Sequence, residues 1–195
     1  MRRAVLERST RETRVEVSLN LDGAGQAEVA TGCGFLDHML LLTAVHGGLD
    51  LTVRCCGDQQ VDDHHLVEDT GLVLGRCIKA ALGSREGIGR YGDALIPMDE
   101  SLARAVVDVS GRGLLVSRLT FSAAKVGSFD TELVAEFFQA LVREAGLTLH
   151  LELLYGGNTH HQVEAVFKAF ARALRRAGAR NGQYEGVPSS KGVMG

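Results

Sequence analysis

The sequence predicts an α+β fold made of two similar halves, each a β-sheet with helices packed against it. The chain has 195 residues, of which 45% are hydrophobic, enough for one good core or two small fused ones. Strand-like and helix-like segments follow one another along the chain, and their order is repeated. Because no linker separates the repeats, we expect a single domain over residues 1–195, with halves of about 1–93 and 94–195.

The first half contains four strand-like or turn-linked segments and two helices. Polar and apolar residues alternate over residues 1–8, 14–20 and 26–31, and the Asp-Gly-Ala-Gly turn at 22–25 indicates a hairpin between the last two. Residues 34–46 have a helical pattern, and residues 48–55 alternate again as a strand. Apolar residues at helical spacing then run from 63 to 82, where Gly83 ends the helix.

The second half shows the same succession of elements. Residues 94–119 predict two or three strands, interrupted by a Gly-rich turn at 110–113. Asp130 is the expected N-cap of a helix over 133–145, which is followed by a strand over 146–154. A long amphipathic helix covers 160–177, and we expect the Gly- and Ser-rich tail from Gly178 to be exposed.

Charge and composition exclude several classes of protein. The net charge of −3, without a long Lys or Arg run, gives no electrostatic reason to expect nucleic-acid binding. The charged first eight residues fit neither a signal peptide nor a membrane span, so we expect a cytoplasmic protein without a membrane partner. The four cysteines lack Cys-x-x-Cys spacing, which predicts reduced and mostly packed thiols.

The repeat carries one His-His-x-x-Glu motif in each half. A helix is followed by a Gly-Leu-x-Leu strand, a loop, and then His64 to Glu68 or His160 to Glu164 at the start of the next helix. The simplest explanation is two half-domains related by a pseudo-twofold axis, each presenting one motif. One such motif is more typical of a solvated helix start, since Glu favours the first turn. Two copies at matching positions favour a functional site.

Helix geometry indicates how each motif can bind metal. The Glu lies about one turn beyond both histidines, whereas adjacent histidines diverge by roughly 100°. One His and the Glu can therefore serve one ion while the other His faces a second ion. Imidazole and carboxylate donors suit Mn²⁺, Fe²⁺ or Zn²⁺, and the spacing does not choose among them. Of the other histidines, His150 is better explained as a packed or exposed strand residue, and His46 as the end of a helix.

Three loop cations suit a phosphate group. Arg90, Arg112 and Lys191 lie in Gly- or Ser-rich loops, although ordinary surface charge explains each one equally well. The segment from Gly87 to Gly92 fits G-x-G-x-x-G, but it follows a helix and leads into a strand. A dinucleotide site is therefore not expected there.

Several sequence blocks together resemble the imidazoleglycerol-phosphate dehydratase family, from about residue 2 to the C-terminus. They are Gly34-Phe-Leu-Asp-His-Met39, Asp63-His-His-Leu-Val-Glu-Asp-Thr70, Pro97-Met-Asp-Glu100, His160-His-Gln-Val-Glu164 and Pro188-Ser-Ser-Lys-Gly192. The resemblance implies a duplicated fold of the ribosomal protein S5 domain 2-like type, with the helices sandwiched between two sheets. It also implies a homo-oligomer, a 24-subunit shell built from trimers, with active sites between subunits.

The resemblance also implies a set of site residues and a cofactor, two Mn²⁺ ions in each active site. Glu136 stands where many family members have a histidine, and we retain it because carboxylate can replace imidazole on manganese. The implied metal ligands are His38, His64, His65, Glu68, Glu136, His160, His161 and Glu164. The implied substrate-binding residues are Glu12, His46, Arg90, Arg112, Ser189, Ser190 and Lys191.

The implied activity is that of a hydro-lyase in histidine biosynthesis. It converts imidazoleglycerol phosphate to imidazole-acetol phosphate and water. No carbonyl acidifies the C2 hydrogen, so the expected solution is a metal-bound imidazolate that expels the C3 hydroxyl to give a diazafulvene-like intermediate. Glu12 is the candidate base for C2, and Arg90, Arg112 and Lys191 are expected to hold the phosphate.

Two other functions remain open at this point. A metal-storage shell also places Glu and His on helices, but it has no use for a phosphate clamp. A metal-dependent phosphoesterase would use both metals and clamp, and it would release inorganic phosphate where a dehydratase retains it. No residues remain for a fused phosphatase domain, so we expect a monofunctional chain.

Overall fold

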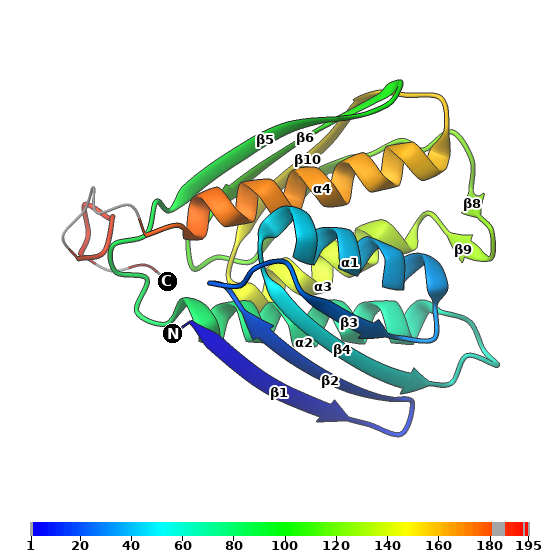
Figure 1. Ribbon diagram of the computed structural model, residues 1–195, viewed down its shortest axis with the longest axis horizontal. Helices are drawn as coiled ribbons and strands as arrows, with labels where there is room; N and C mark the ends of the chain where they lie inside the picture. Colours follow the sequence, from blue (N-terminus) through cyan, green and yellow to red (C-terminus); the bar gives the residue numbers. More distant parts are fainter. Residues whose placement is uncertain (1, 181–185, 193, 195) are drawn as a thin grey trace.

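In the computed structural model, which describes residues 2–180, 186–192 and 194, a layer of helices lies between two four-stranded sheets (Figure 1). A short hairpin, β8 (Lys125–Val126) and β9 (Phe129–Asp130), lies at one end of this layer. Sheet one contains β1 (Arg3–Ser9), β2 (Thr13–Asn20), β3 (Ala27–Ala30) and β4 (Asp50–Gly57). Sheet two contains β5 (Tyr91–Met98), β6 (Ser101–Asp108), β7 (Leu114–Arg118) and β10 (Thr148–Tyr155). The helices are α1 (Gly34–Gly47), α2 (His64–Leu82), α3 (Leu133–Ala145) and α4 (Thr159–Gly178).

The two sheets have the same topology. Their strand orders are β1-β2-β4-β3 and β5-β6-β10-β7, and in each sheet only the last pair is parallel. The expected α+β class and duplicated arrangement are therefore confirmed, including the helices between the sheets. The treatment of residues 1–195 as one domain, with halves meeting near residue 93, stays a prediction.

The hairpin expected between residues 14–20 and 26–31 is wrong. β2 pairs with β1 and β4, while β3 pairs in parallel with the far edge of β4. The cause is Asp50 at the start of β4, whose carboxylate accepts hydrogen bonds from the amides of Ala24 (2.8 Å) and Gln26 (3.3 Å). These bonds carry the segment after β2 across the end of β4, which separates β2 from β3.

Two smaller expectations also need correction. Asp130 does not cap α3, because it ends β9 and its carboxylate pairs with Lys125 at 3.1 Å; Glu132 occupies the N-cap position. The tail is only partly exposed, since Gly186 accepts a hydrogen bond from the Gly87 amide and Met194 packs against the core. The described part of the tail thus lies against the loop between α2 and β5.

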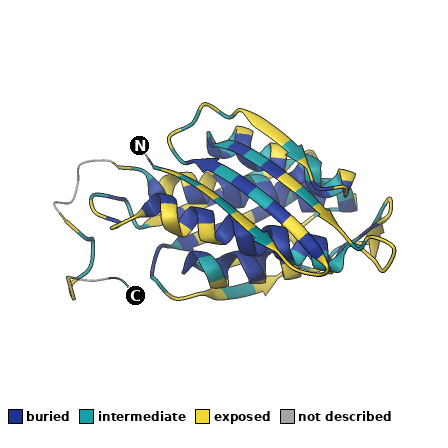
Figure 2. Cartoon of the chain, turned by 90° about the horizontal axis from the view of Figure 1, so that it is seen from below, coloured by how far each residue is buried: buried dark blue, intermediate teal, exposed yellow. Residues whose placement is uncertain are grey.

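The helix layer exchanges partners between the two halves. α2 lies on sheet one and packs against α3, whereas α4 lies on sheet two and packs against α1. Inward-facing strand residues alternate with exposed ones, and most of the buried residues lie in the helices (Figure 2). No helix in the described ranges is both long and apolar enough to span a bilayer.

Candidate functional site

Both His-His-x-x-Glu motifs lie at the first turn of a helix, as predicted. Asn158 caps α4 by accepting hydrogen bonds from the amides of His160 (2.9 Å) and His161 (3.4 Å). The rings of His160 and His161 stand at 84°, with centroids 6.2 Å apart, and the His64 and His65 rings diverge in the same way. The two histidines of one motif therefore face different directions.

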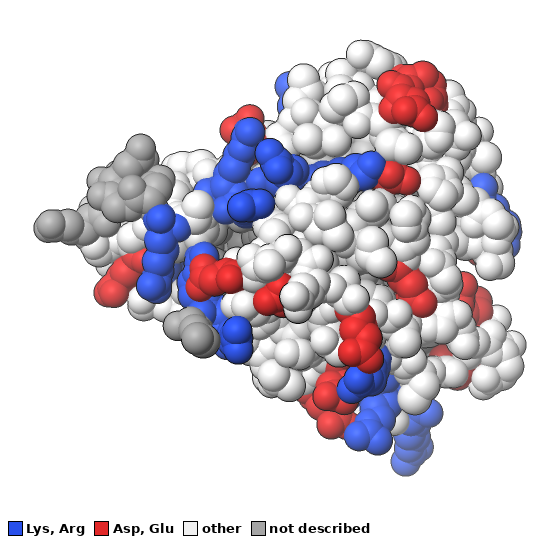
Figure 3. All heavy atoms as spheres, in the orientation of Figure 1, with Lys and Arg blue, Asp and Glu red and all other residues white. Residues whose placement is uncertain are grey.

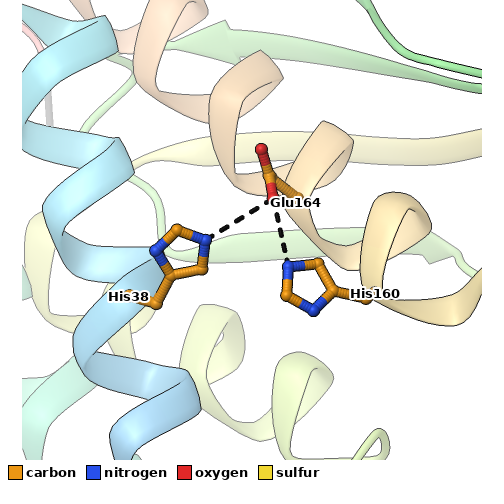
Figure 4. A group of neighbouring side chains, drawn as sticks. All are labelled: His38, His160 and Glu164. Atoms are coloured by element: carbon orange, nitrogen blue, oxygen red, sulfur yellow. Dashed lines mark ion pairs between the residues drawn. The ribbon is translucent and has the colours of Figure 1, made fainter.

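The second motif forms a compact group of metal-type donors with a residue of the first half. His38 of α1 and His160 of α4 both point toward Glu164 (Figure 4). The Glu164 Oε2 atom lies 3.2 Å from His160 Nε2 and 3.5 Å from His38 Nε2. Three donor atoms, one from each residue, all lie within 4.8 Å of one another, and two imidazoles with one carboxylate suit a borderline divalent cation.

Lys168 holds the carboxylate of this group in its charged form. Glu164 is buried, and its Oε1 atom lies 2.5 Å from Lys168 Nζ. Burial alone raises the pKa of Glu164, but the hydrogen bond from Lys168 and the charges of Lys168, His38 and His160 outweigh burial and leave this pKa below its usual value. The carboxylate thus stays ionised, which is the form in which a carboxylate binds a metal ion.

The second histidine of each motif is held by a separate carboxylate. His65 Nδ1 lies 3.0 Å from Asp58 Oδ2, and His161 Nδ1 lies 2.8 Å from Glu100 Oε2. These hydrogen bonds are the main cause of a raised pKa at both histidines. A carboxylate on Nδ1 fixes the ring orientation and leaves Nε2 for a metal ion.

The first motif is more open. His64 Nε2 lies 4.0 Å from Glu68 Oε2, and Glu68 Oε1 faces Arg143 at 3.7 Å. Glu136 is exposed on α3, the helix that packs against α2. Within the described ranges, the only close group of three or more donors is that of His38, His160 and Glu164. Of the eight expected ligands, these three lie together and the other five lie outside the group.

Glu12 lies beside the first motif, and His46 lies beside the cationic residues of α4. Glu12 is in the turn between β1 and β2, its carbonyl accepts a hydrogen bond from the Asp58 amide at 3.1 Å, and its charge contributes to the raised pKa of His65. His46 is in the last turn of α1, where burial and then the charges of Lys168 and Arg172 lower its pKa.

The expected phosphate-binding residues gather at the opposite end of the molecule. Arg90 bonds Asp108 through Nε (2.9 Å) and the Pro188 carbonyl through Nη1 (2.9 Å), which brings it beside Ser189, Ser190 and Lys191. The Gly89 amide bonds the Ala179 carbonyl at the C-terminal end of α4, whereas His160 is at the N-terminal end. At 1.5 Å per residue, this separation is roughly 27 Å. Arg112 follows β6 at the same end as Arg90.

Sequence reasoning missed four residues of the site. Lys168 and Arg172 continue the four-residue spacing of His160 and Glu164 along α4, and this spacing could have revealed them. Figure 3 shows Lys and Arg side chains gathered over the C-terminal half of α4, where Arg172, Arg175 and Arg176 line a shallow pocket.

The other two missed residues are carboxylates. Glu100 lies in the Pro97–Glu100 sequence block, where no role was assigned to it. Asp58 carries no spacing signal, because its contact with His65 depends on the loop fold.

The fold and the histidine and glutamate groups define a duplicated α+β protein with a metal-type donor site between its helices. A sequence profile of the imidazoleglycerol-phosphate dehydratase family matches residues 31–174. The imidazoleglycerol-phosphate dehydratase of Desulforamulus reducens is 56% identical, with 99% of this chain and 98% of that protein covered, and that of Methylorubrum populi is 55% identical over the full length of both chains.

Solved structures agree with the sequence relatives. The crystal structure of the Staphylococcus aureus dehydratase has a TM-score of 0.81 at 46% identity and covers 89% of this chain and 96% of its own. The Pyrococcus furiosus structure has a TM-score of 0.84 at 34% identity and covers 97% of this chain and all of its own. The chain belongs to the imidazoleglycerol-phosphate dehydratase family, and it is accordingly an enzyme of the hydro-lyase class.

Proposed function

We propose that this protein dehydrates imidazoleglycerol phosphate to imidazole-acetol phosphate and water, a step of histidine biosynthesis. The observation that carries the proposal is the grouping of His38, His160 and Glu164 in a member of this family. Imidazole and carboxylate donors at this distance suit a divalent metal, and the substrate named by the family contains an imidazole ring that can complete its coordination.

The cofactor would be two Mn²⁺ ions in each active site. The donor set of His38, His160 and Glu164 fits one such ion, with Glu164 kept charged by Lys168. The bound ions would hold the substrate imidazole as imidazolate, whose electrons can expel the C3 hydroxyl. The full proposed ligand set is His38, His64, His65, Glu68, Glu136, His160, His161 and Glu164.

The remaining steps belong to side chains of the protein. Loss of the C3 hydroxyl would give a diazafulvene-like form of the substrate, from which Glu12 would then remove the C2 proton. The C2–H and C3–O bonds are broken, water is released, and the resulting enol tautomerises to the ketone. Arg90, Arg112 and Lys191, with Ser189 and Ser190, would hold the phosphate, while His46 would line the path between the two regions.

The active site would lie between subunits of a homo-oligomer. The donor group and the Arg90 region of one chain are separated by roughly 27 Å along α4, longer than a substrate with one imidazole ring and a three-carbon phosphate chain. Contributions from neighbouring copies remove this difficulty, in keeping with the proposed 24-subunit shell of trimers. The enzyme would act in the cytoplasm on a small-molecule phosphate.

The test is turnover by the metal-free protein with and without added Mn²⁺. The substrate is imidazoleglycerol phosphate, and the ketone product and free phosphate are assayed in parallel. Manganese-dependent ketone formation with phosphate retained would support the proposal. Release of inorganic phosphate would instead indicate a phosphoesterase, and tight metal binding without turnover would indicate a storage protein.

A further inference from the structure

The two halves hold their second motif histidine with carboxylates from different positions of the repeat. Thr13, the first residue of β2, pairs with Gly57 of β4. In sheet two, Ser101 is the first residue of β6 and therefore corresponds to Thr13. A register shift between Leu153 and Tyr155 adds one residue to β10, so the residue that faces Ser101 lies one position later than a direct count would give.

Glycine contacts support the same correspondence. A Cβ atom on Gly57 would lie 3.0 Å from Thr13 Cγ2, and a Cβ atom on Gly156 would meet the Ser101 hydroxyl. Gly57 therefore matches Gly156, and Asp58 matches Gly157. The residues before Thr13 and Ser101 match as well, so Glu12 corresponds to Glu100.

In the second half, the turn glutamate holds the histidine. Glu100 Oε2 forms a hydrogen bond with His161 Nδ1 at 2.8 Å. Its Oε1 accepts hydrogen bonds from the backbone amides of Asn158 (2.7 Å) and Gly157 (3.2 Å). Asp99 precedes it with φ of 47°, a left-handed conformation that forms the tight turn. The Asp99 carboxylate is 3.8 Å from His161 Nε2, beyond hydrogen-bond distance, so Nε2 remains open to an ion.

In the first half, the position after the strand provides the carboxylate instead. Asp58 bonds His65 Nδ1 at 3.0 Å, while its own amide bonds the Glu12 carbonyl at 3.1 Å. The same contact region thus orients His65 and fixes the backbone of Glu12. Thr13 adds a hydrogen bond from its hydroxyl to the buried Asp69 of α2, which ties the turn to the motif helix.

We propose that Asp58 and Glu100 are positioning residues that orient His65 and His161 for metal binding, and that Asp58 frees Glu12 for catalysis. The inference rests on the proposed function, because it takes Glu12 as the C2 base. The two halves share a fold but differ in this contact. In the first half Asp58 holds His65, so the turn residue Glu12 is not needed for that purpose, whereas in the second half the turn residue Glu100 holds His161 itself. Equivalent glutamates therefore have different tasks.

The test compares Mn²⁺ affinity and turnover in isosteric variants. We expect Glu100→Gln and Asp58→Asn to weaken Mn²⁺ binding by about 10- to 100-fold, as loss of such a partner to a ligating histidine does. Saturating Mn²⁺ should restore much of their turnover. Glu12→Gln should lose turnover and keep wild-type Mn²⁺ affinity within about twofold. Affinity is measured by calorimetric titration of the metal-free proteins.

Two controls separate positioning from general damage. Glu152→Gln changes a surface glutamate paired with Arg104 on sheet two and should match wild type in every measurement. Circular dichroism spectra of the metal-free variants should also match wild type, because the fold is retained without these carboxylates. If the wild-type protein binds Mn²⁺ and turns over substrate, two results would overturn the inference. One is an unchanged Mn²⁺ affinity in Glu100→Gln, and the other is a loss of Mn²⁺ affinity in Glu12→Gln equal to that in Glu100→Gln. A wild-type protein that neither binds Mn²⁺ nor turns over substrate would overturn the proposed function itself.

Discussion

At the scale of single residues, the carboxylate of Glu164 contacts the Lys168 ammonium group and two imidazole rings. One oxygen faces His38 and His160 and the other faces Lys168, so one buried carboxylate serves both sides. Its charge depends on these partners, because burial favours the protonated form.

Replacement of Lys168 should therefore weaken metal binding. In Lys168→Met the pKa of Glu164 should rise, and a proton should then compete with the metal ion. We expect Mn²⁺ affinity near neutral pH to fall by about tenfold, the equivalent of one pKa unit. A titration of metal-free protein measures this, with the exposed Lys79→Met as control. Equal affinities in the two variants would show that Lys168 does not maintain the charge of Glu164.

Metal binding should also depend on pH through His65 and His161. Their carboxylate partners raise the pKa of both imidazoles above the usual value of about 6.5. Below the raised pKa both ring nitrogens carry protons, so Mn²⁺ affinity should fall as pH decreases through it and level off above it. In the metal-free protein, the ion pairs of His65 with Asp58 and of His161 with Glu100 stabilise the fold fully at pH values below the ordinary imidazole pKa. That stabilisation is lost as the pH rises through the raised pKa of the folded protein. Affinities that do not change between about pH 6 and 8 would contradict this expectation.

At the scale of elements, the helix layer depends on close approach between α2 and α3. Gly71 and Gly75 of α2 lie against the carbonyls of Phe137 and Leu141, and a Cβ atom on Gly71 would lie only 2.5 Å from the Phe137 oxygen. The glycines thus set the distance between the two helices, and with it the position of the first motif relative to Glu136.

Alanine at these glycines should destabilise the fold. In an open helix interior, Gly→Ala stabilises by roughly 0.5–1 kcal/mol, but here the added methyl group must push the two backbones apart. We expect Gly71→Ala to lower the free energy of unfolding by about 1–3 kcal/mol, as overpacking does. Urea denaturation measures the change. Gly34→Ala is the matched control, because nothing lies within 4 Å of a Cβ atom there, and similar losses in both variants would refute the packing argument.

The sequence predicted the elements better than their partners. The duplication, the four helices and the placement of both motifs follow from local periodicity and repeat, which a single sequence contains. The separation of β2 from β3 involves Asp50, whose carboxylate accepts hydrogen bonds from the amides of Ala24 and Gln26, and no local sequence pattern indicates these contacts. For the same reason the contacts of Asp58 and Glu100 with the motif histidines could not be predicted, since loops bring them together.

At the scale of the whole molecule, the proposed site is divided between its two ends. The donor group lies at the N-terminal end of α4, and Arg90 and Arg112 lie near its other end. If sites form between subunits, two inactive variants should complement each other when they assemble together.

Mixed assemblies test this division directly. We expect His160→Ala and Arg112→Ala each to be inactive alone, because one loses a proposed metal ligand and the other a proposed phosphate contact. After joint refolding in equal amounts, about a quarter of sites that draw on two subunits should contain both intact parts. Turnover of the mixture is compared with each variant refolded alone. No recovery in co-assembled protein would place the whole site within one chain.

The exchange of helix partners bears on the origin of the chain. His38 of the first half completes its donor group only with His160 and Glu164 of the second, because α1 packs against α4. A precursor with a single repeat could assemble the same group only as a homodimer, each copy placing its first helix against the motif helix of the other. Gene fusion would then have preserved an existing dimer and allowed two once identical glutamates, Glu12 and Glu100, to diverge.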